Sequence, residues 1–127
     1  IGHRLVTRQP GSGSDNYIKY LFKSHHISYS DFVNTEIAYS ENDAVLLILS
    51  GQADVTLGLA SEAEKYQLQF YPVVTERFDL VVNRKHWFEK PFQDLINFCR
   101  TEEFFETASK LNGYNISNLG TVHFNSK

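Results

Sequence analysis

Residues able to hold an anion gather in one early stretch of the chain, Leu5 to Asp15, which reads LVTRQPGSGSD. Its first residues are typical of a buried strand, Pro10 and Gly11 break that strand, and an amphipathic helix is expected from Asp15 to about His25. A junction of this kind points unpaired backbone N–H groups and the positive end of a helix dipole at one place. The stretch therefore predicts an anion-binding loop.

Two serines and two glycines of this loop would contact the anion or allow it to approach. Ser12 and Ser14 would add hydroxyl donors, while Gly11 and Gly13 would permit close approach of a ligand or a positive φ. The same residues also suit an ordinary tight turn in which Ser14 or Asp15 is the helix N-cap. This stretch alone does not decide between the two interpretations.

The elements that must position the loop alternate between strand and helix patterns. Ser40 has the pattern of a hydroxyl N-cap for a buried helix. Strands are predicted at 5–7, 32–38, 53–59, 68–74 and 78–82, and helices at 15–25, 40–49, 61–66, 90–99 and 101–111. This order predicts an α/β domain with a largely parallel sheet. The loops 9–15, 39–41 and 58–61 should then meet at the carboxyl edge of that sheet, where such folds bind ligands.

The last third of the chain reads as two helices followed by a turn-rich tail. Cys99 falls on the apolar face of the first helix, so it is expected to be a buried structural thiol. Thr101 is expected to cap the second helix, whose inner face would carry Phe104, Phe105, Ala108 and Leu111. A short edge strand is expected at 121–124.

Composition excludes several classes of partner. The 127 residues carry a formal charge of −3 with no basic stripe, which argues against nucleic-acid binding by this segment. No apolar run approaches the roughly 20 residues that cross a bilayer, so no membrane partner is expected. One cysteine fits a reducing, cytoplasmic location. The chain begins with Ile1 and has no methionine, so we expect it to be part of a longer protein.

Catalytic and cofactor motifs are missing from the sequence. Gly11 and Gly13 are followed by Asn16 rather than a third glycine, and no P-loop lysine follows, which argues against NAD and nucleoside triphosphates. His3, His86 and His123 are isolated, so no metal site is expected. We therefore expect a binding domain without cofactor or catalytic residues rather than an enzyme.

Four blocks in order carry a family resemblance: RQPGSGSD, the run from Ser40 to Gly58 ending SGQADVTLG, FYPVVTERFDLVV, and LNGYNISNLGTV. Together they resemble the periplasmic-binding-protein-like domain attached to MoeA-type molybdopterin-biosynthesis proteins and to molybdenum-linked helix-turn-helix regulators. The resemblance spans nearly the whole chain. It implies a type 2 periplasmic-binding fold, in which two α/β lobes close on a ligand.

The resemblance also implies how the 127 residues are divided and used. Residues 1–75 would form the second lobe, and residues 76–127 the return strand and C-terminal helices of a single ligand-binding domain. Similar loops in tungstate- and molybdate-binding proteins open onto the oxyanion, and Arg8 matches the family's arginine and would balance charge. The resemblance gives the ligand-binding role to Ser12, Gly13 and Ser14. Gly11 would permit close backbone approach and Ser40 would complete the site from the next helix, so the predicted ligand-binding residues are Arg8, Gly11, Ser12, Gly13, Ser14 and Ser40.

Two residues depart from the family pattern. Ser40-Glu41 stands where the family has Thr-His, and Glu41 would repel an oxyanion if it faced the cleft. Thr56 stands where the family has glycine or alanine, which would narrow the pocket. A pterin-type or other polar ligand therefore stays open beside molybdate.

Three functions follow as hypotheses. The first is a small-ligand-binding module, for an oxyanion such as molybdate or tungstate or a related precursor, in molybdenum-cofactor biosynthesis. The second is the effector-sensing domain of a transcription regulator, and the third an interaction domain with a vestigial cleft. If half of the first lobe is absent, the apolar faces of the two C-terminal helices would be uncovered, and a homo-oligomer could cover them.

Overall fold

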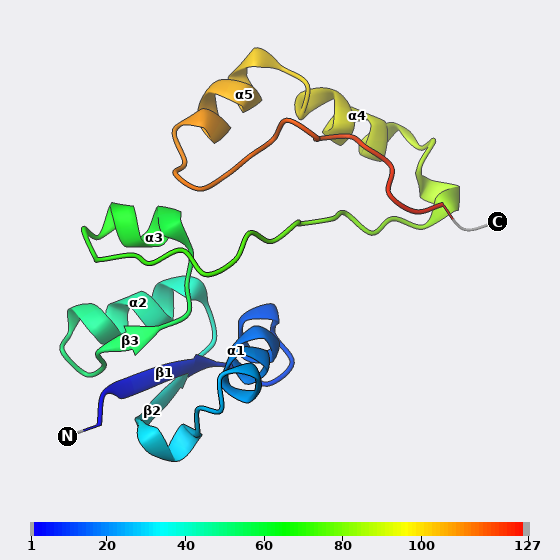
Figure 1. Ribbon diagram of the computed structural model, residues 1–127. Helices are drawn as coiled ribbons and strands as arrows, with labels where there is room; N and C mark the ends of the chain where they lie inside the picture. The colour runs from blue at the N-terminus through cyan, green and yellow to red at the C-terminus, as the bar shows by residue number, and fades with distance from the viewer. Residues whose placement is uncertain (1, 126–127) are drawn as a thin grey trace. The chain divides into compact units, whose positions relative to one another are not determined.

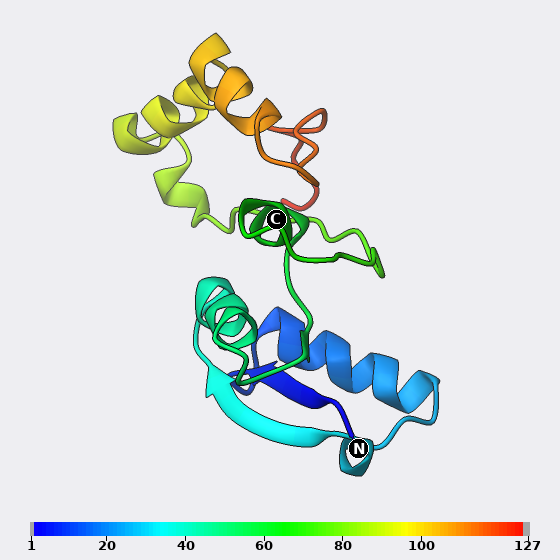
Figure 2. The same ribbon diagram turned by 90° about the vertical axis from the view of Figure 1, so that its left-hand side faces the viewer.

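A computed structural model describes residues 2–125 of the chain. The chain divides into two compact units, one ending at Phe70 and the other beginning at Tyr71. Figures 1 and 2 show the elements of each unit from two directions.

The first unit is built on a three-stranded parallel sheet with strand order β2-β1-β3. Strand β1 (Arg4–Arg8) is central and pairs with β2 (Val33–Ala38) on one side and β3 (Val55–Thr56) on the other. Helices α1 (Gly13–Ser24), α2 (Glu41–Leu49) and α3 (Ala60–Lys65) follow the three strands in turn. A short 3-10 helix, η1 (Tyr29–Asp31), precedes β2. The predicted α/β fold with a parallel sheet flanked by helices is confirmed.

The two faces of β1 are covered by different helices, as Figure 2 shows. Successive side chains of a strand point to opposite faces, so Leu5 and Val6 enter separate clusters. Leu5 packs with Ile18 and Phe22 of α1, and Val6 packs with alanines on β2, on α2 and before β3. Both faces of the central strand are therefore buried, as parallel sheets require.

An ion pair joins the beginning of β1 to the residue just before β3. The Arg4 guanidinium donates to both carboxylate oxygens of Asp54, at 2.6 and 3.1 Å, and the Arg4 backbone N–H donates to the same group at 2.7 Å. These hydrogen bonds lower the pKa of Asp54 to about 2. The contact fixes the amino edge of the sheet, opposite the edge where ligands are expected.

Several predicted boundaries in the first unit need correction. The first helix begins at Gly13 with Ser12 as its N-cap, so the prediction that Ser14 or Asp15 caps it was wrong. The strand predicted at 53–59 is only Val55–Thr56, the two residues that pair with Leu5 and Val6 of β1. The helix predicted at 61–66 is α3, Ala60–Lys65.

The second unit contains helical elements and irregular segments. Its elements are a 3-10 helix, η2 (Arg84–His86), and helices α4 (Lys90–Phe98) and α5 (Glu102–Ser109). The ring of Trp87 packs on Phe92 at 5.2 Å between centroids, and Phe98 packs on Phe104 at 5.7 Å. Thr101 caps α5 as predicted, its hydroxyl accepting the N–H of Phe104.

The strands predicted at 68–74, 78–82 and 121–124 are absent from the described chain. These segments are rich in strand-forming residues, but a strand exists only where a neighbour exchanges ladder hydrogen bonds with it. No such neighbour is paired with them in residues 2–125, and Val81 is 98% exposed.

The helical faces of this second unit are also less buried than predicted. Neither α4 nor α5 has a buried residue, Cys99 is half-buried, and Phe105 and Leu111 are exposed. Within the described residues of this unit, the expectation that these side chains lie in a closed core was wrong.

Candidate functional site

The loop after β1 is held in shape by its own side chains. Gly11 has a φ of 85° and donates its backbone N–H to Asp15 Oδ2 at 2.9 Å, while Ser12 Oγ accepts the Asp15 N–H at 3.1 Å. Asp15 is buried and also pairs with Lys19 Nζ at 2.7 Å. The Lys19 ammonium and then the Gly11 N–H lower the pKa of Asp15. Part of the predicted anion cradle is thus occupied by this internal carboxylate.

Other donors at the beginning of α1 stay available. No hydrogen bond from the backbone N–H of Gly13 or Ser14 is seen within residues 2–125, as expected for the first turn of a helix. The Ser12 hydroxyl accepts a bond as N-cap and keeps its own proton for donation. The helix therefore presents unpaired donors beside its cap.

A charged cluster joins the end of β1 to the beginnings of α1 and α2. The Arg8 side chain is 10% exposed and forms an ion pair with Glu41 Oε1, while its Nε donates to Gln9 Oε1 at 3.1 Å. The Ser14 hydroxyl donates to the same Glu41 oxygen at 3.4 Å. One carboxylate oxygen is thus bound by a guanidinium and a hydroxyl that come from different elements.

The second oxygen of Glu41 lacks a partner. Glu41 Oε2 is buried and accepts no hydrogen bond from the part of the chain that is described. Gly58 lies beside it, since a Cβ added there would be 3.8 Å from Oε2. The three loops predicted to meet at the carboxyl edge of the sheet do so around this glutamate.

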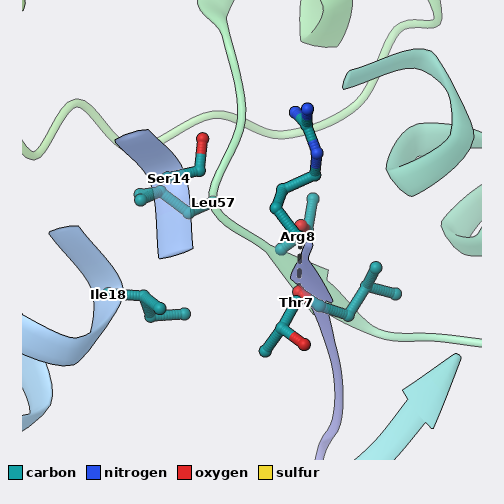
Figure 3. Close-up of a pocket in the computed structure, with 7 residues that line it drawn as sticks. Thr7, Arg8, Ser14, Ile18 and Leu57 are labelled. Carbon is teal, nitrogen blue, oxygen red and sulfur yellow. Dashed lines mark hydrogen bonds between the residues drawn. The ribbon is translucent and has the colours of Figure 1, made fainter. Parts of the chain in front are cut away.

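A shallow hollow lies next to the cluster and is drawn in Figure 3. The polar ends of Ser14 and Arg8 point to the same side in this view, and the side chain of Ile18 lies on α1 below them. The hollow is lined by Val6, Thr7, Arg8, Ser14, Ile18, Thr56 and Leu57. It does not enclose even a water-sized volume. Ligand pockets usually enclose ~300 Å³ or more, so this hollow is too shallow to enclose a ligand by itself.

The six residues predicted to bind ligand occupy different positions. Arg8 and Ser14 come together on Glu41, whereas Gly11 and Gly13 form the turn and the first helical position beside them. Ser12 and Ser40 are the N-caps of α1 and α2, and Ser40 Oγ accepts the Asp43 N–H at 3.0 Å.

Glu41 was not among the predicted site residues, although it contacts both Arg8 and Ser14. The sequence contained a signal for it, because Glu41 stands directly after the Ser40 cap of α2, where the family pattern has histidine. Thr56 lines the hollow as expected, and its hydroxyl donates to the Val6 carbonyl at 3.1 Å.

Neither a cluster of metal ligands nor a membrane-spanning helix is found among the described residues. Residues 2–125 contain no group of three or more His, Cys, Asp or Glu side chains placed to hold a metal ion. None of the described helices has the length and apolar character needed to span a membrane.

Comparison with known proteins identifies the family. No solved structure gives a significant match. The uncharacterized protein YvgK of Bacillus subtilis (strain 168) is 28% identical over 125 residues, which cover 94% of this chain and 38% of that protein. The chain thus spans well under half the length of this relative. The family model of the PBP superfamily domain matches residues 2–100. With its parallel sheet, flanking helices and polar carboxyl edge, the chain belongs to the periplasmic-binding-protein (PBP) superfamily.

Proposed function

We propose that this domain binds a small oxyanion, such as molybdate, tungstate or a related precursor, without catalysing a reaction. The observation that carries the proposal is the pairing of Glu41 Oε1 with both Arg8 and Ser14. A guanidinium and a hydroxyl aimed at one anionic oxygen are the donors that an oxyanion needs. The unpaired N–H groups of Gly13 and Ser14 would add backbone donors at the positive end of α1.

Charge and burial support an anion over other small ligands. The Arg8 side chain is 10% exposed, so its charge is screened less by solvent than that of a surface arginine. The hollow beside it is lined by apolar groups of Val6, Ile18 and Leu57, which would limit competing water. The opposite wall would come from the other lobe that the family resemblance implies.

A role in molybdenum-cofactor biosynthesis is the finer part of the proposal. It is supported by the four sequence blocks, of which RQPGSGSD contains Arg8 and Ser14. The PBP superfamily match supports ligand binding in general and does not select the ligand.

Isothermal titration calorimetry of the full chain with molybdate, tungstate, sulfate and phosphate tests the proposal. We expect one of the four to bind, and Arg8→Gln to weaken that binding about tenfold or more, because a charge-assisted hydrogen bond is lost. Lys23→Gln is the control for net charge, since it also removes one positive charge but lies in the last turn of α1, at the end opposite the site. Absence of heat with all four anions, in a sample whose circular dichroism shows folding, would refute the oxyanion proposal.

A further inference from the structure

Glu41 occupies the place that the proposed function assigns to an external anion. Its Oε1 already takes the Arg8 guanidinium and the Ser14 hydroxyl, the pair of side-chain donors on which the proposed function rests. Ser14 has a single hydroxyl proton, so it cannot donate to Glu41 and to a ligand at the same time. An arriving oxyanion must therefore compete with this carboxylate.

The bound state of Glu41 is incompletely satisfied. Its Oε2 is buried without a partner in the described chain, and a buried carboxylate oxygen without hydrogen bonds carries a desolvation cost. Release of the side chain into water would restore hydration to that oxygen. Glu41 is the first residue of α2 and its side chain is 28% exposed, so solvent is within reach.

Neighbouring acidic groups do not share this position. Asp43 also lies in the first turn of α2, but it is exposed, and its backbone N–H bonds Ser40. Asp15 is committed to Lys19 and to the Gly11 N–H within the loop. Glu41 alone among these three carboxylates is bonded to Arg8 and Ser14.

We propose that Glu41 is an internal competitor, a carboxylate that holds Arg8 and Ser14 in the empty site and must leave before an oxyanion binds there. The inference rests on the proposed function, because it concerns the affinity of the same site. It makes Glu41 the residue that limits anion affinity, although the sequence alone suggested only that it would repel a ligand.

Replacement of Glu41 by glutamine tests the inference. Glutamine keeps the shape of the side chain but removes the charge, so the anion no longer displaces an ion pair and is not repelled by a nearby carboxylate. For whichever of molybdate, tungstate, sulfate or phosphate binds, we expect Glu41→Gln to lower the Kd about tenfold. Asp43→Asn removes a charge from the same helical turn without touching Arg8, and it should change the Kd by less than about threefold.

Two additional variants keep the test independent of folding and of general charge effects. Glu41→Ala should also bind more tightly than the wild type, and it serves if the glutamine variant is unstable. The double variant Arg8→Gln/Glu41→Gln should lose the gain, since the competitor matters only while Arg8 is present.

The outcomes separate the two proposals. If the wild type binds an anion and both Glu41 variants bind it equally or more weakly, the competitor role is refuted and the binding function stands. Equal gains from Asp43→Asn and Glu41→Gln would also refute it, because a general charge effect would then be sufficient. If wild type and variants are all folded and bind none of the four anions, the proposed function fails and the competitor role fails with it.

Discussion

Two serines of the candidate site cap helices and a third, Ser14, does not, and this division can be tested by substitution. Ser12 Oγ accepts the Asp15 N–H at 3.1 Å and Ser40 Oγ accepts the Asp43 N–H at 3.0 Å, so each caps a helix. Ser14 lies inside the first turn of α1, where its hydroxyl donates to Glu41 and caps nothing.

The expected magnitudes follow from these contacts. Loss of an N-cap hydroxyl costs about 1 kcal/mol of unfolding free energy when serine becomes alanine, and only a few tenths when it becomes glycine. Ser12→Ala and Ser40→Ala should therefore each destabilise by about 1 kcal/mol, and the glycine variants much less. Ser14→Ala removes one long hydrogen bond of 3.4 Å and should cost under about 0.5 kcal/mol.

Urea unfolding followed by circular dichroism measures these differences, and calorimetry with the bound anion measures affinity. We expect Ser14→Ala to weaken binding about tenfold while leaving stability nearly unchanged. Ser12→Gly should retain most of the stability and so reveal the binding contribution of that hydroxyl by itself. The reasoning would be wrong if Ser14→Ala proved the most destabilising of the three alanine variants, or if glycine at position 12 cost as much as alanine.

Three further predictions concern the fold. Val6 is fully buried among small alanines that cannot fill a gap, so Val6→Ala should cost about 2 kcal/mol in urea unfolding. The control Val33→Ala, on the edge strand and half exposed, should cost less than half of that, and equal costs would contradict the assigned core. The folded-state pKa of Asp54 is lowered from 3.8 to about 2, so the Arg4–Asp54 pair should stabilise the fold above pH 3.8 and lose this effect as the pH falls toward 2. The stability difference between wild type and Asp54→Asn should shrink over that interval, and a pH-independent difference would contradict the pairing. Exposed apolar side chains in residues 71–125, among them Tyr71, Val81 and Phe88, lead us to expect concentration-dependent self-association, which light scattering would detect and a strict monomer would refute.

Local chemistry made much of the first unit predictable from sequence. Alternation of Leu5 and Val6, the hydroxyls before the helices and the order of strand and helix patterns each reflect forces that act within a few residues. The order of strands and helices also indicated a parallel sheet, so its carboxyl edge could be predicted as the place where the loops meet. The N-cap of α1 was assigned two or three residues late, because serines at 12 and 14 are equivalent by composition and only backbone geometry distinguishes them.

Pairing between distant segments could not be predicted in this way. Residues 68–74 and 78–82 have strong strand propensity, yet propensity does not supply the neighbour whose N–H and C=O groups complete a ladder. The apolar faces of α4 and α5 likewise predict burial, but the sequence pattern does not identify the element that would cover them.

The sequence by itself determined the α/β class and the caps of α2 and α5, because those depend on residue type and short spacing. Only the tertiary structure decided that Arg8 and Ser14 meet on Glu41, a residue 33 positions from Arg8 along the chain. Parallel pairing of β1 with β2 brings Arg8 opposite Ala38 and so places the beginning of α2 beside the end of β1. Because of that register, Glu41, which was expected only to repel a ligand, forms an ion pair with Arg8.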